Sequence, residues 1–194
     1  LEETPWPARQ LIDLGSYHYQ IDKHNATSLI AQLGCPFACG FCGGRLSPSL
    51  RNIRTRTTEN IVAEMVYLYK TYGYTGFMMY DDELNVNKGI VELMHKIADA
   101  QDELNTSWRL RGFVKAELFT EEQAQAMYRA GFREILVGFE SGSPRILTNI
   151  KKNATREENT RCVTFARKHG LRIKALMSVG HPGESEATLG DTAE

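Results

Sequence analysis

Three of the four cysteines of this 194-residue chain lie close together, and they are the residues best suited to chemistry. They follow the order Cys35-Pro-Phe-Ala-Cys39-Gly-Phe-Cys42. Thiolates this close repel one another unless a metal centre neutralises them, and soft sulfur ligands select iron–sulfur clusters, zinc or Cu(I). Zinc usually takes a fourth ligand and paired Cys-x2-Cys spacings, and no second pair occurs here. A cubane cluster on three cysteines would leave one iron open, while a zinc knuckle and a disulfide-rich loop remain alternatives.

The composition suits about one domain and excludes several classes of protein. The net charge is −1 at pH 7 with acids and bases intermixed, so no nucleic-acid or membrane-surface footprint is present. No apolar run approaches the roughly 20 residues of a membrane span, and no signal peptide is recognisable. Cysteines in a metal-like spacing favour the reducing cytoplasm, and the separate Cys162 is interpreted as an ordinary buried thiol. Because the chain begins with Leu1 and ends inside a helical pattern, we expect a piece of a longer protein.

The chain from Thr27 onward alternates between apolar runs and helical periodicity. Strands are expected at 27–33, 77–80, 107–113, 134–139 and 171–179. Helices are expected at 58–73 with Thr58 as N-cap, at 90–98, at 120–131 with a near capping box, near Pro144, at 156–169 and at 184–194. Five βα units predict a parallel sheet with helices outside it, either open and doubly wound or a partial barrel.

Two other segments are interpreted as lacking regular structure. Residues 1–26 contain Pro5 and Pro7 on either side of Trp6, a spacing that disfavours helix and strand, so they are expected to be a linker. His18 and His24 within it are expected at the surface. The basic cluster of Arg51, Arg54 and Arg56 is interpreted as a solvated loop.

The ends of the second and third strands carry charged residues, and ligands of parallel α/β folds bind at the carboxyl ends of strands. Asp81, Asp82 and Glu83 could receive an ammonium group, or could cap the next helix. Arg109 and Arg111 share one face of a mostly apolar strand. They could bind a carboxylate in a polar cavity, or could form an edge-strand ion pair.

The ends of the fourth and fifth strands offer a carboxylate and flexible backbone. Glu140 and Ser141 follow an apolar run, and the carboxylate suits a ribose diol, although Glu140 could simply be held by the next turn. Gly180 and Gly183 flank His181-Pro182 and allow the backbone to approach a planar ligand, or form a tight turn. His181 is interpreted as a wall residue.

These motifs together resemble the radical S-adenosylmethionine (radical SAM) enzymes, over about residues 27–194. The resemblance is greatest to the branch with a cobalamin-binding domain upstream of the core. It is carried by Cys35-Pro-x-x-Cys39-x-Phe41-Cys42, Tyr80-Asp81-Asp82, Gly138-Phe139-Glu140-Ser141-Gly142-Ser143 and Gly180-His181-Pro182-Gly183-Glu184. It implies an α/β fold, a parallel (β/α)6 partial TIM-type barrel, here truncated after about strand five. Residues 1–26 resemble the connector that precedes this core.

The resemblance also implies cofactors and roles. A 4Fe–4S cluster on Cys35, Cys39 and Cys42 would bind S-adenosylmethionine through its open iron. Phe41, Gly180 and Gly183 would lie near the adenine. The ammonium, carboxylate and ribose groups would be met by Asp81 or Asp82, by Arg109 and Arg111, and by Glu140 with Ser141. The family often has Gly-Gly-Glu where this chain has Asp81-Asp82-Glu83.

The function implied is reductive cleavage of S-adenosylmethionine to a 5′-deoxyadenosyl radical for hydrogen abstraction or methyl transfer. Cobalamin would bind to an upstream domain not in this chain. The partners would be a small-molecule or peptide substrate and an electron donor such as flavodoxin or ferredoxin. A non-catalytic zinc or iron–sulfur module and a methylthiotransferase-like radical SAM enzyme are the alternatives.

Overall fold

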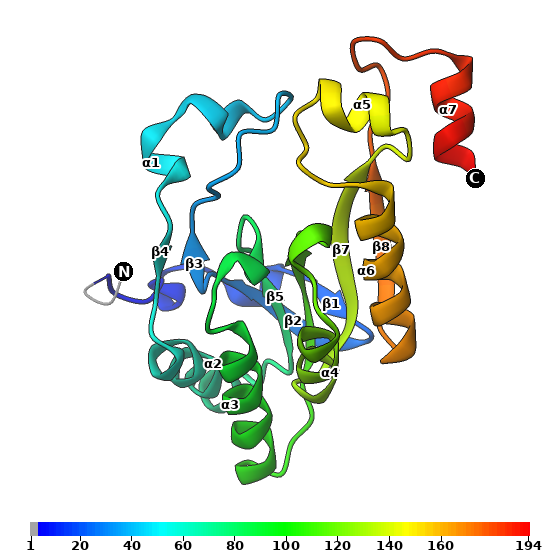
Figure 1. Cartoon of the computed structure of the whole chain (residues 1–194). Helices are drawn as coiled ribbons and strands as arrows, with labels where there is room; N and C mark the ends of the chain where they lie inside the picture. Colours follow the sequence, from blue (N-terminus) through cyan, green and yellow to red (C-terminus); the bar gives the residue numbers. More distant parts are fainter. Residues whose placement is uncertain (1–3) are drawn as a thin grey trace.

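Residues 4–194, which the computed structural model describes, form a central six-stranded sheet in the order β1-β2-β5-β6-β7-β8 (Figure 1). The strands are β1 Gln20–Ile21, β2 His24–Leu29, β5 Gly76–Met79, β6 Arg109–Val114, β7 Phe132–Glu140 and β8 Arg172–Met177. All neighbouring pairs are parallel except β1–β2, which is an antiparallel hairpin. The sheet is curled into a partial barrel, which confirms the predicted fold class.

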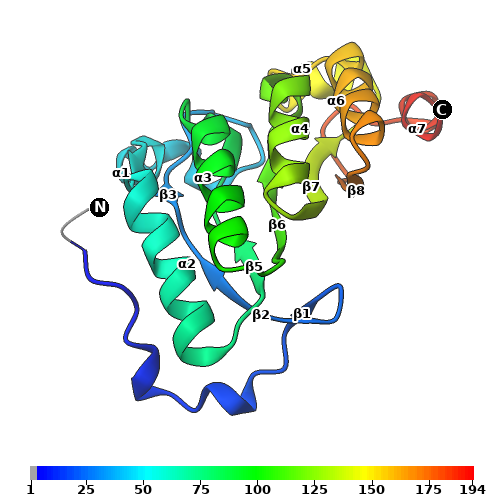
Figure 2. The same cartoon turned by 90° about the horizontal axis from the view of Figure 1, so that it is seen from below.

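The helices cover the outer face of the curled sheet, as Figure 2 shows for α2, α3, α4 and α6. Side chains alternate between the two faces of a strand. Phe77, Met79 and Val137 therefore join the large core under the helices, whereas Met78 and Leu136 lie in a smaller cluster on the other face. The helices are α1 Pro48–Arg51, α2 Thr58–Tyr72, α3 Ile90–Glu103, α4 Glu121–Arg129, α5 Pro144–Asn149, α6 Arg156–Lys168 and α7 Glu186–Ala193.

The helix starts agree with the predicted caps, with one shift. Thr120 forms a complete capping box with Gln123 at the start of α4, as expected. The N-cap of α2 is Thr57, one residue before the predicted Thr58. No helix of the described residues is long and apolar enough to cross a membrane.

The expectation that the segment before Thr27 contains neither helix nor strand is wrong for the residues that the structure describes. The segment contains the short 3-10 helices η1 Arg9–Leu11 and η2 Leu14–Ser16, the strand β1 and the start of β2. Proline restricts only its own neighbourhood, and the β1–β2 turn is made by Asp22 and Lys23 with φ of 47° and 70°. Two-residue turns with positive φ normally contain glycine or asparagine. The pair Asp22-Lys23 contains neither, so the sequence does not indicate a hairpin here.

The expected strand 27–33 is also wrong in its second half. The chain leaves the sheet after Leu29, and Gln32–Leu33 forms β3, which pairs with β4 (Arg54–Thr55). The cause is Asp81, whose carboxylate accepts hydrogen bonds from the backbone N–H groups of Ala31 and Gln32. Three further 3-10 turns are η3 Gly43–Leu46, η4 Leu84–Val86 and η5 Ala116–Leu118.

Two predicted surface groups are instead bound to the fold. Arg56 donates to Glu64 Oε2 at 2.6 Å and to the carbonyl of Ile30, so the interpretation of its cluster as a solvated loop is wrong for this residue. His24, expected without a partner, is half-buried in β2, where its Nδ1 lies 3.0 Å from Thr75 Oγ1.

Candidate functional site

The loop of residues 34–42 carries the three cysteines at the carboxyl edge of the sheet, between α1 and α5 in Figure 1. Its backbone is held from several sides: Cys35 N–H donates to Leu50 O (2.8 Å) and Gly40 N–H to Ile150 O (2.6 Å). Among the three thiols, Cys39 is buried, Cys35 half-buried and Cys42 exposed. The backbone of the loop is thus held by hydrogen bonds, and its three cysteines differ in solvent exposure.

Arg51 adds a further support to this loop. Its Nη2 donates to the carbonyl of Pro36 at 2.6 Å. Together with Arg56, this means that two of the three arginines predicted to be solvated hold the segments around the cysteines in place. No local pattern in the sequence predicts either contact.

Asp81 and Asp82 position the start of the cysteine loop. Asp81 Oδ1 accepts from Ala31 N–H at 3.1 Å and Gln32 N–H at 2.5 Å, and Asp82 Oδ2 accepts from Gly34 N–H at 2.8 Å. Burial raises the pKa of Asp81 to about 7, although its backbone hydrogen bonds act in the opposite direction. One oxygen of each carboxylate therefore binds the backbone at the start of the cysteine loop, and the ammonium-binding role stays a prediction.

Two buried lysines lie beside the cysteines and were missed by the sequence analysis. Lys115 and Lys152 are 2% and 4% exposed. The Nζ of Lys115 lies 4.2 Å from the centre of the Phe37 ring and donates to the carbonyl of Lys152 at 3.2 Å. Burial raises the pKa of the Cys39 thiol, and these two ammonium groups act in the opposite direction. They supply positive charge where thiolates would need it.

Carboxylates accompany the two lysines. Lys115 pairs with Glu117, and Lys152 Nζ lies 3.3 Å from Glu140 Oε1. Glu83 lies near both lysines, yet burial dominates and raises its pKa to about 7. The site therefore contains two buried lysines, each paired with a glutamate, and a third buried glutamate, Glu83.

Glu140, predicted to be functional, ends β7 in an unusual conformation. Its φ is 64°, and the β7–β8 register shifts between Gly138 and Glu140. Backbone strain of this kind is concentrated at functional sites. Its Oε2 accepts from Ser178 Oγ at 2.8 Å, and Ser178 Oγ lies 2.7 Å from His181 Nε2. The Glu140 carboxylate is thus held by Lys152, from the loop after α5, and by Ser178, from the loop after β8.

Phe41 and His181 lie together. Their ring centres are 5.8 Å apart, and Lys152 Nζ is 5.9 Å from the Phe41 ring. The structure therefore brings Cys39, Phe41, Lys152 and Glu140 into one region, with His181 as part of its wall.

Ser141 and the two predicted glycines have distinct surroundings. Ser141 Oγ lies 3.1 Å from Thr192 Oγ1 and accepts from Ser143 N–H, so it ties the turn after β7 to α7. Gly180 and Gly183 have φ of 91° and 90°. A Cβ on Gly180 would meet nothing within 4 Å, whereas one on Gly183 would lie 2.7 Å from Asn149 Nδ2. Open space lies only beside Gly180.

The structure does not bring Arg109 and Arg111 to the cysteine loop. Arg109 begins β6, at the opposite end of the strand from the loop, and its Nη1 donates to Ser107 Oγ and Trp108 O. Arg111 Nε lies 2.8 Å from Glu134 Oε1. The contact is close in distance but too poorly aligned to count as a hydrogen bond, so it is an ion pair.

The comparisons with known proteins agree with this geometry. The family model described as "Radical SAM superfamily" matches residues 29–194. An uncharacterized methyltransferase of Pyrococcus horikoshii is 30% identical over 97% of the chain and 41% of its own length. An anaerobic magnesium-protoporphyrin IX monomethyl ester cyclase of Synechocystis is 27% identical over 84% of the chain and 32% of its own length. The chain thus spans less than half of these relatives.

Solved structures show the same fold. The radical SAM methyltransferase TsrM of Kitasatospora setae, with cobalamin and a [4Fe-4S] cluster bound, superposes with a TM-score of 0.77 at 24% identity, over 88% of this chain and 34% of that one. The cobalamin-dependent enzyme OxsB superposes with a TM-score of 0.74 at 18% identity, over 87% and 26%. At these identities the likeness establishes the partial barrel and nothing finer.

Proposed function

The chain belongs to the radical SAM superfamily, and we propose that Cys35, Cys39 and Cys42 hold a 4Fe–4S cluster at which S-adenosylmethionine is cleaved. The observation that carries this proposal is the fixed cysteine loop beside two buried lysines. The donor set fits such a cluster, because three thiols are offered without a fourth protein ligand. Among residues 4–194, no three His, Cys, Asp or Glu side chains converge as they would on one metal ion. Structural zinc usually takes four ligands, and the cysteine loop offers three thiols.

The bound cluster would supply the electron that splits S-adenosylmethionine into methionine and a 5′-deoxyadenosyl radical. The protein's part is to hold the cofactor against the substrate and to exclude water. We assign the ribose diol to Glu140, whose carboxylate is already oriented by Lys152 and Ser178. Phe41 and the open space beside Gly180 suit the adenine.

The charged ends of S-adenosylmethionine fit other residues than those first expected. Lys115 and Lys152, rather than Arg109 and Arg111, are the cations near the cysteines that suit its carboxylate. Asp81 and Asp82 support the cysteine loop, and Ser141 and Gly183 shape the neighbouring turns. We assign the ammonium group to Glu83, a buried acid near the same two lysines.

The reaction proposed is hydrogen abstraction or methyl transfer on a substrate. Methyl transfer is supported by the 30% identical methyltransferase relative. Cobalamin is proposed to bind to an upstream domain, with residues 1–26 as the connector and 27–194 as the core. The electron donor would be a flavodoxin or ferredoxin in the cytoplasm, where thiols stay reduced. A methylthiotransferase-like activity is the runner-up within the same family.

Anaerobic reconstitution with iron and sulfide tests the proposal. We expect about four irons per chain and a brown protein, with iron binding lost in Cys39→Ala and retained in Cys162→Ala. Cys162 is the matched control because it is fully buried on α6, where burial raises its pKa to about 12. Equal iron loss in both variants, or a colourless protein that takes up zinc instead, would contradict the assignment.

A further inference from the structure

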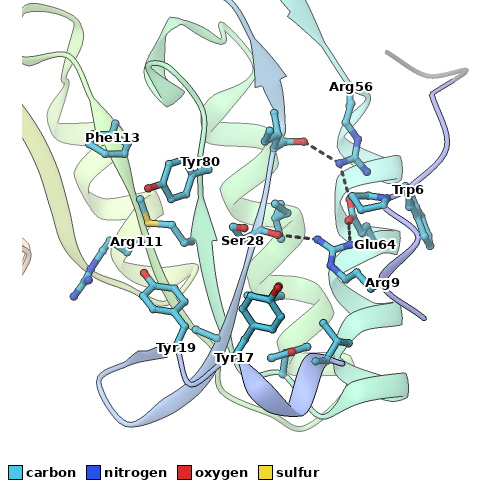
Figure 3. A pocket seen from close by; sticks show the side chains of 18 of the residues that line it. Trp6, Arg9, Tyr17, Tyr19, Ser28, Arg56, Glu64, Tyr80, Arg111 and Phe113 are labelled. Carbon is cyan, nitrogen blue, oxygen red and sulfur yellow. Dashed lines mark hydrogen bonds and ion pairs between the residues drawn. The ribbon is translucent and has the colours of Figure 1, made fainter. Parts of the chain in front are cut away.

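A cavity of about 1190 Å³ lies on the inner face of the curled sheet and extends to Glu64 of α2. Its walls come from the strands and from the N-terminal segment, which folds across one side of it (Figure 3). Binding sites for small molecules commonly occupy about 300–1,000 Å³. The cavity is therefore large enough for a sizeable substrate.

The wall is mainly apolar and rich in aromatic rings. Tyr17, Tyr19, Tyr80 and Phe113 lie around the space in Figure 3. Met78 of β5 also lines it. The rings of Tyr80 and Phe113 pack edge to face, with centres 6.1 Å apart. Tyr80 is nevertheless 60% exposed. Exposed rings with apolar bodies suit a flat apolar ligand that stacks against them.

The charges of the wall are predominantly positive. Within residues 4–194, its charged side chains are one acid, Glu64, and four bases, Arg9, Arg56, Arg111 and Lys174. Arg9 and Arg56 both bind Glu64, at 2.7 and 2.6 Å, so this acid of the wall is already paired with two bases.

Arg111 and Lys174 carry the remaining positive charge on the strands. Arg111 shares Glu134 with Arg172, at 2.8 and 3.8 Å. Lys174 has no hydrogen-bond or ion-pair partner for its side chain within residues 4–194. The two residues lie on β6 and β8, on either side of β7. Lys174 is in register with Leu136 of β7, and Arg111 with Glu134, two residues earlier on that strand. An arginine and a lysine in an apolar wall are suited to binding a carboxylate.

The cavity reaches the cysteine loop. Ile30 and Leu33 line it and belong to the segment that leads directly to Cys35. Tyr80 lines it and precedes Asp81, which holds the start of that loop. One edge of the cavity therefore lies at the segment that leads into the cysteine loop.

We propose that this cavity binds the substrate, and that the substrate is a flat, largely apolar molecule with a carboxylate. The carboxylate pairs with Arg111 and Lys174, and the apolar body lies against Tyr80, Phe113 and Met78. The inference rests on the proposed radical SAM function and adds the chemical class of its substrate.

The test is a fluorescence titration of the chain with 1-pyrenebutyrate and with the neutral 1-pyrenebutanol, which share one flat apolar body. We expect the acid to bind about tenfold more tightly than the alcohol. Arg111→Met and Lys174→Met should each remove most of that preference without changing the affinity for the alcohol. Lys174 is exposed on an edge strand, so its variant keeps the test valid if Arg111→Met fails to fold.

Arg133→Met is the matched control, because Arg133 lies on β7, does not line the cavity and stacks on Tyr128 at 4.0 Å. Equal affinities for acid and alcohol, or the same loss in the control, would overturn the substrate class. Iron content and S-adenosylmethionine cleavage are measured on the same samples. If iron content and S-adenosylmethionine cleavage are normal but 1-pyrenebutyrate is not preferred over the alcohol, only the substrate class is overturned. If the unaltered chain binds no iron, the proposed function is overturned.

Discussion

Asp81 holds the chain at the point where it leaves the sheet, at the cost of keeping a carboxylate away from water. Burial raises its pKa from 3.8 to about 7. Between these values the folded chain binds more protons than the unfolded chain, so the free energy of unfolding should fall as the pH rises from about 4 to 7. Asp81→Asn keeps an oxygen for the two backbone N–H groups and removes the titration.

We therefore expect the unaltered chain to lose stability between pH 5.5 and 8, and Asp81→Asn to lose less. Urea unfolding at both pH values measures this. Part of the slope should remain, because burial also raises the pKa of Glu83 to about 7. Asp99→Asn, at an exposed ion pair with Arg129, should behave like the unaltered chain. Identical slopes for Asp81→Asn and the unaltered chain would contradict the effect.

Glu140 gives a second prediction. If its carboxylate binds the ribose, Glu140→Ala should weaken S-adenosylmethionine binding by about tenfold or more, as expected for a charge-assisted hydrogen bond. The iron content should stay unchanged. Calorimetry with the reconstituted protein measures the affinity, and Glu121→Ala, a solvent-facing carboxylate of α4 paired with Lys168, is the control. A lower unfolding midpoint with unaltered affinity would make Glu140 a support for Lys152 and Ser178 instead.

The residues of the site differ in how well the sequence could predict them. Cys39, Phe41 and Glu140 lie in short local motifs, and the structure brings these three together. Lys115 and Lys152 are 37 positions apart and meet only because the loop after β6 and the loop after α5 converge. No local pattern records such an approach, so a buried lysine after a strand is indistinguishable from a solvated one.

At the level of elements, long apolar runs were predictable and short pairings were not. The five parallel strands each contain enough alternating or apolar residues to be recognised. The two-residue strands β3 and β4 have no periodicity to detect, and they form because Asp81 and Asp82 redirect the chain. These short elements nevertheless hold the cysteine loop.

Gly34 tests that support. Its φ is 102°, and a Cβ there would lie 2.3 Å from the carbonyl oxygen of Asn52. Gly34→Ala should therefore displace the loop from the segment that follows α1 and reduce the iron bound after reconstitution. Gly73→Ala is the matched control: its φ is 73°, but a Cβ would meet nothing within 4 Å. It should cost only about 1–2 kcal/mol of backbone strain and leave iron binding intact. Equal iron contents in the two variants would show that the contact with Asn52 is dispensable.

The molecule as a whole is closed on its inner side by the N-terminal segment. Trp6 Nε1 donates to Asn60 Oδ1 at 3.2 Å, and the Trp6 ring lies 5.6 Å from that of Tyr67 on α2. Arg9 donates to Ser28 O and to Glu64, so the segment is tied to both β2 and α2 (Figure 3). The buried acid Glu64 of α2 binds two arginines. Arg9 belongs to the N-terminal segment, and Arg56 directly follows β4, the strand that pairs with β3 before the cysteine loop.

Removing that acid should loosen the N-terminal segment. Glu64 is 1% exposed, and its loss would leave the side chains of Arg9 and Arg56, 9% and 10% exposed, buried without a counter-charge. Such a change typically costs about 3–5 kcal/mol. We expect Glu64→Ala to lower the free energy of unfolding by that amount in urea titrations. The exposed pair of Arg129 and Asp99 offers the control, because Arg129→Ala should cost less than about 1 kcal/mol.

Trypsin supplies an independent measurement of the same event. Arg9 is buried in the folded chain, so the peptide bond after it should resist cleavage. In Glu64→Ala the segment should detach before the sheet unfolds, and mass spectrometry should detect early cleavage after Arg9. Detachment would also open one wall of the inner cavity and weaken 1-pyrenebutyrate binding. If cleavage at Arg9 stays slow while the whole chain is destabilised, the apolar contact of Trp6 with Tyr67, and not the ion pairs, holds the segment in place.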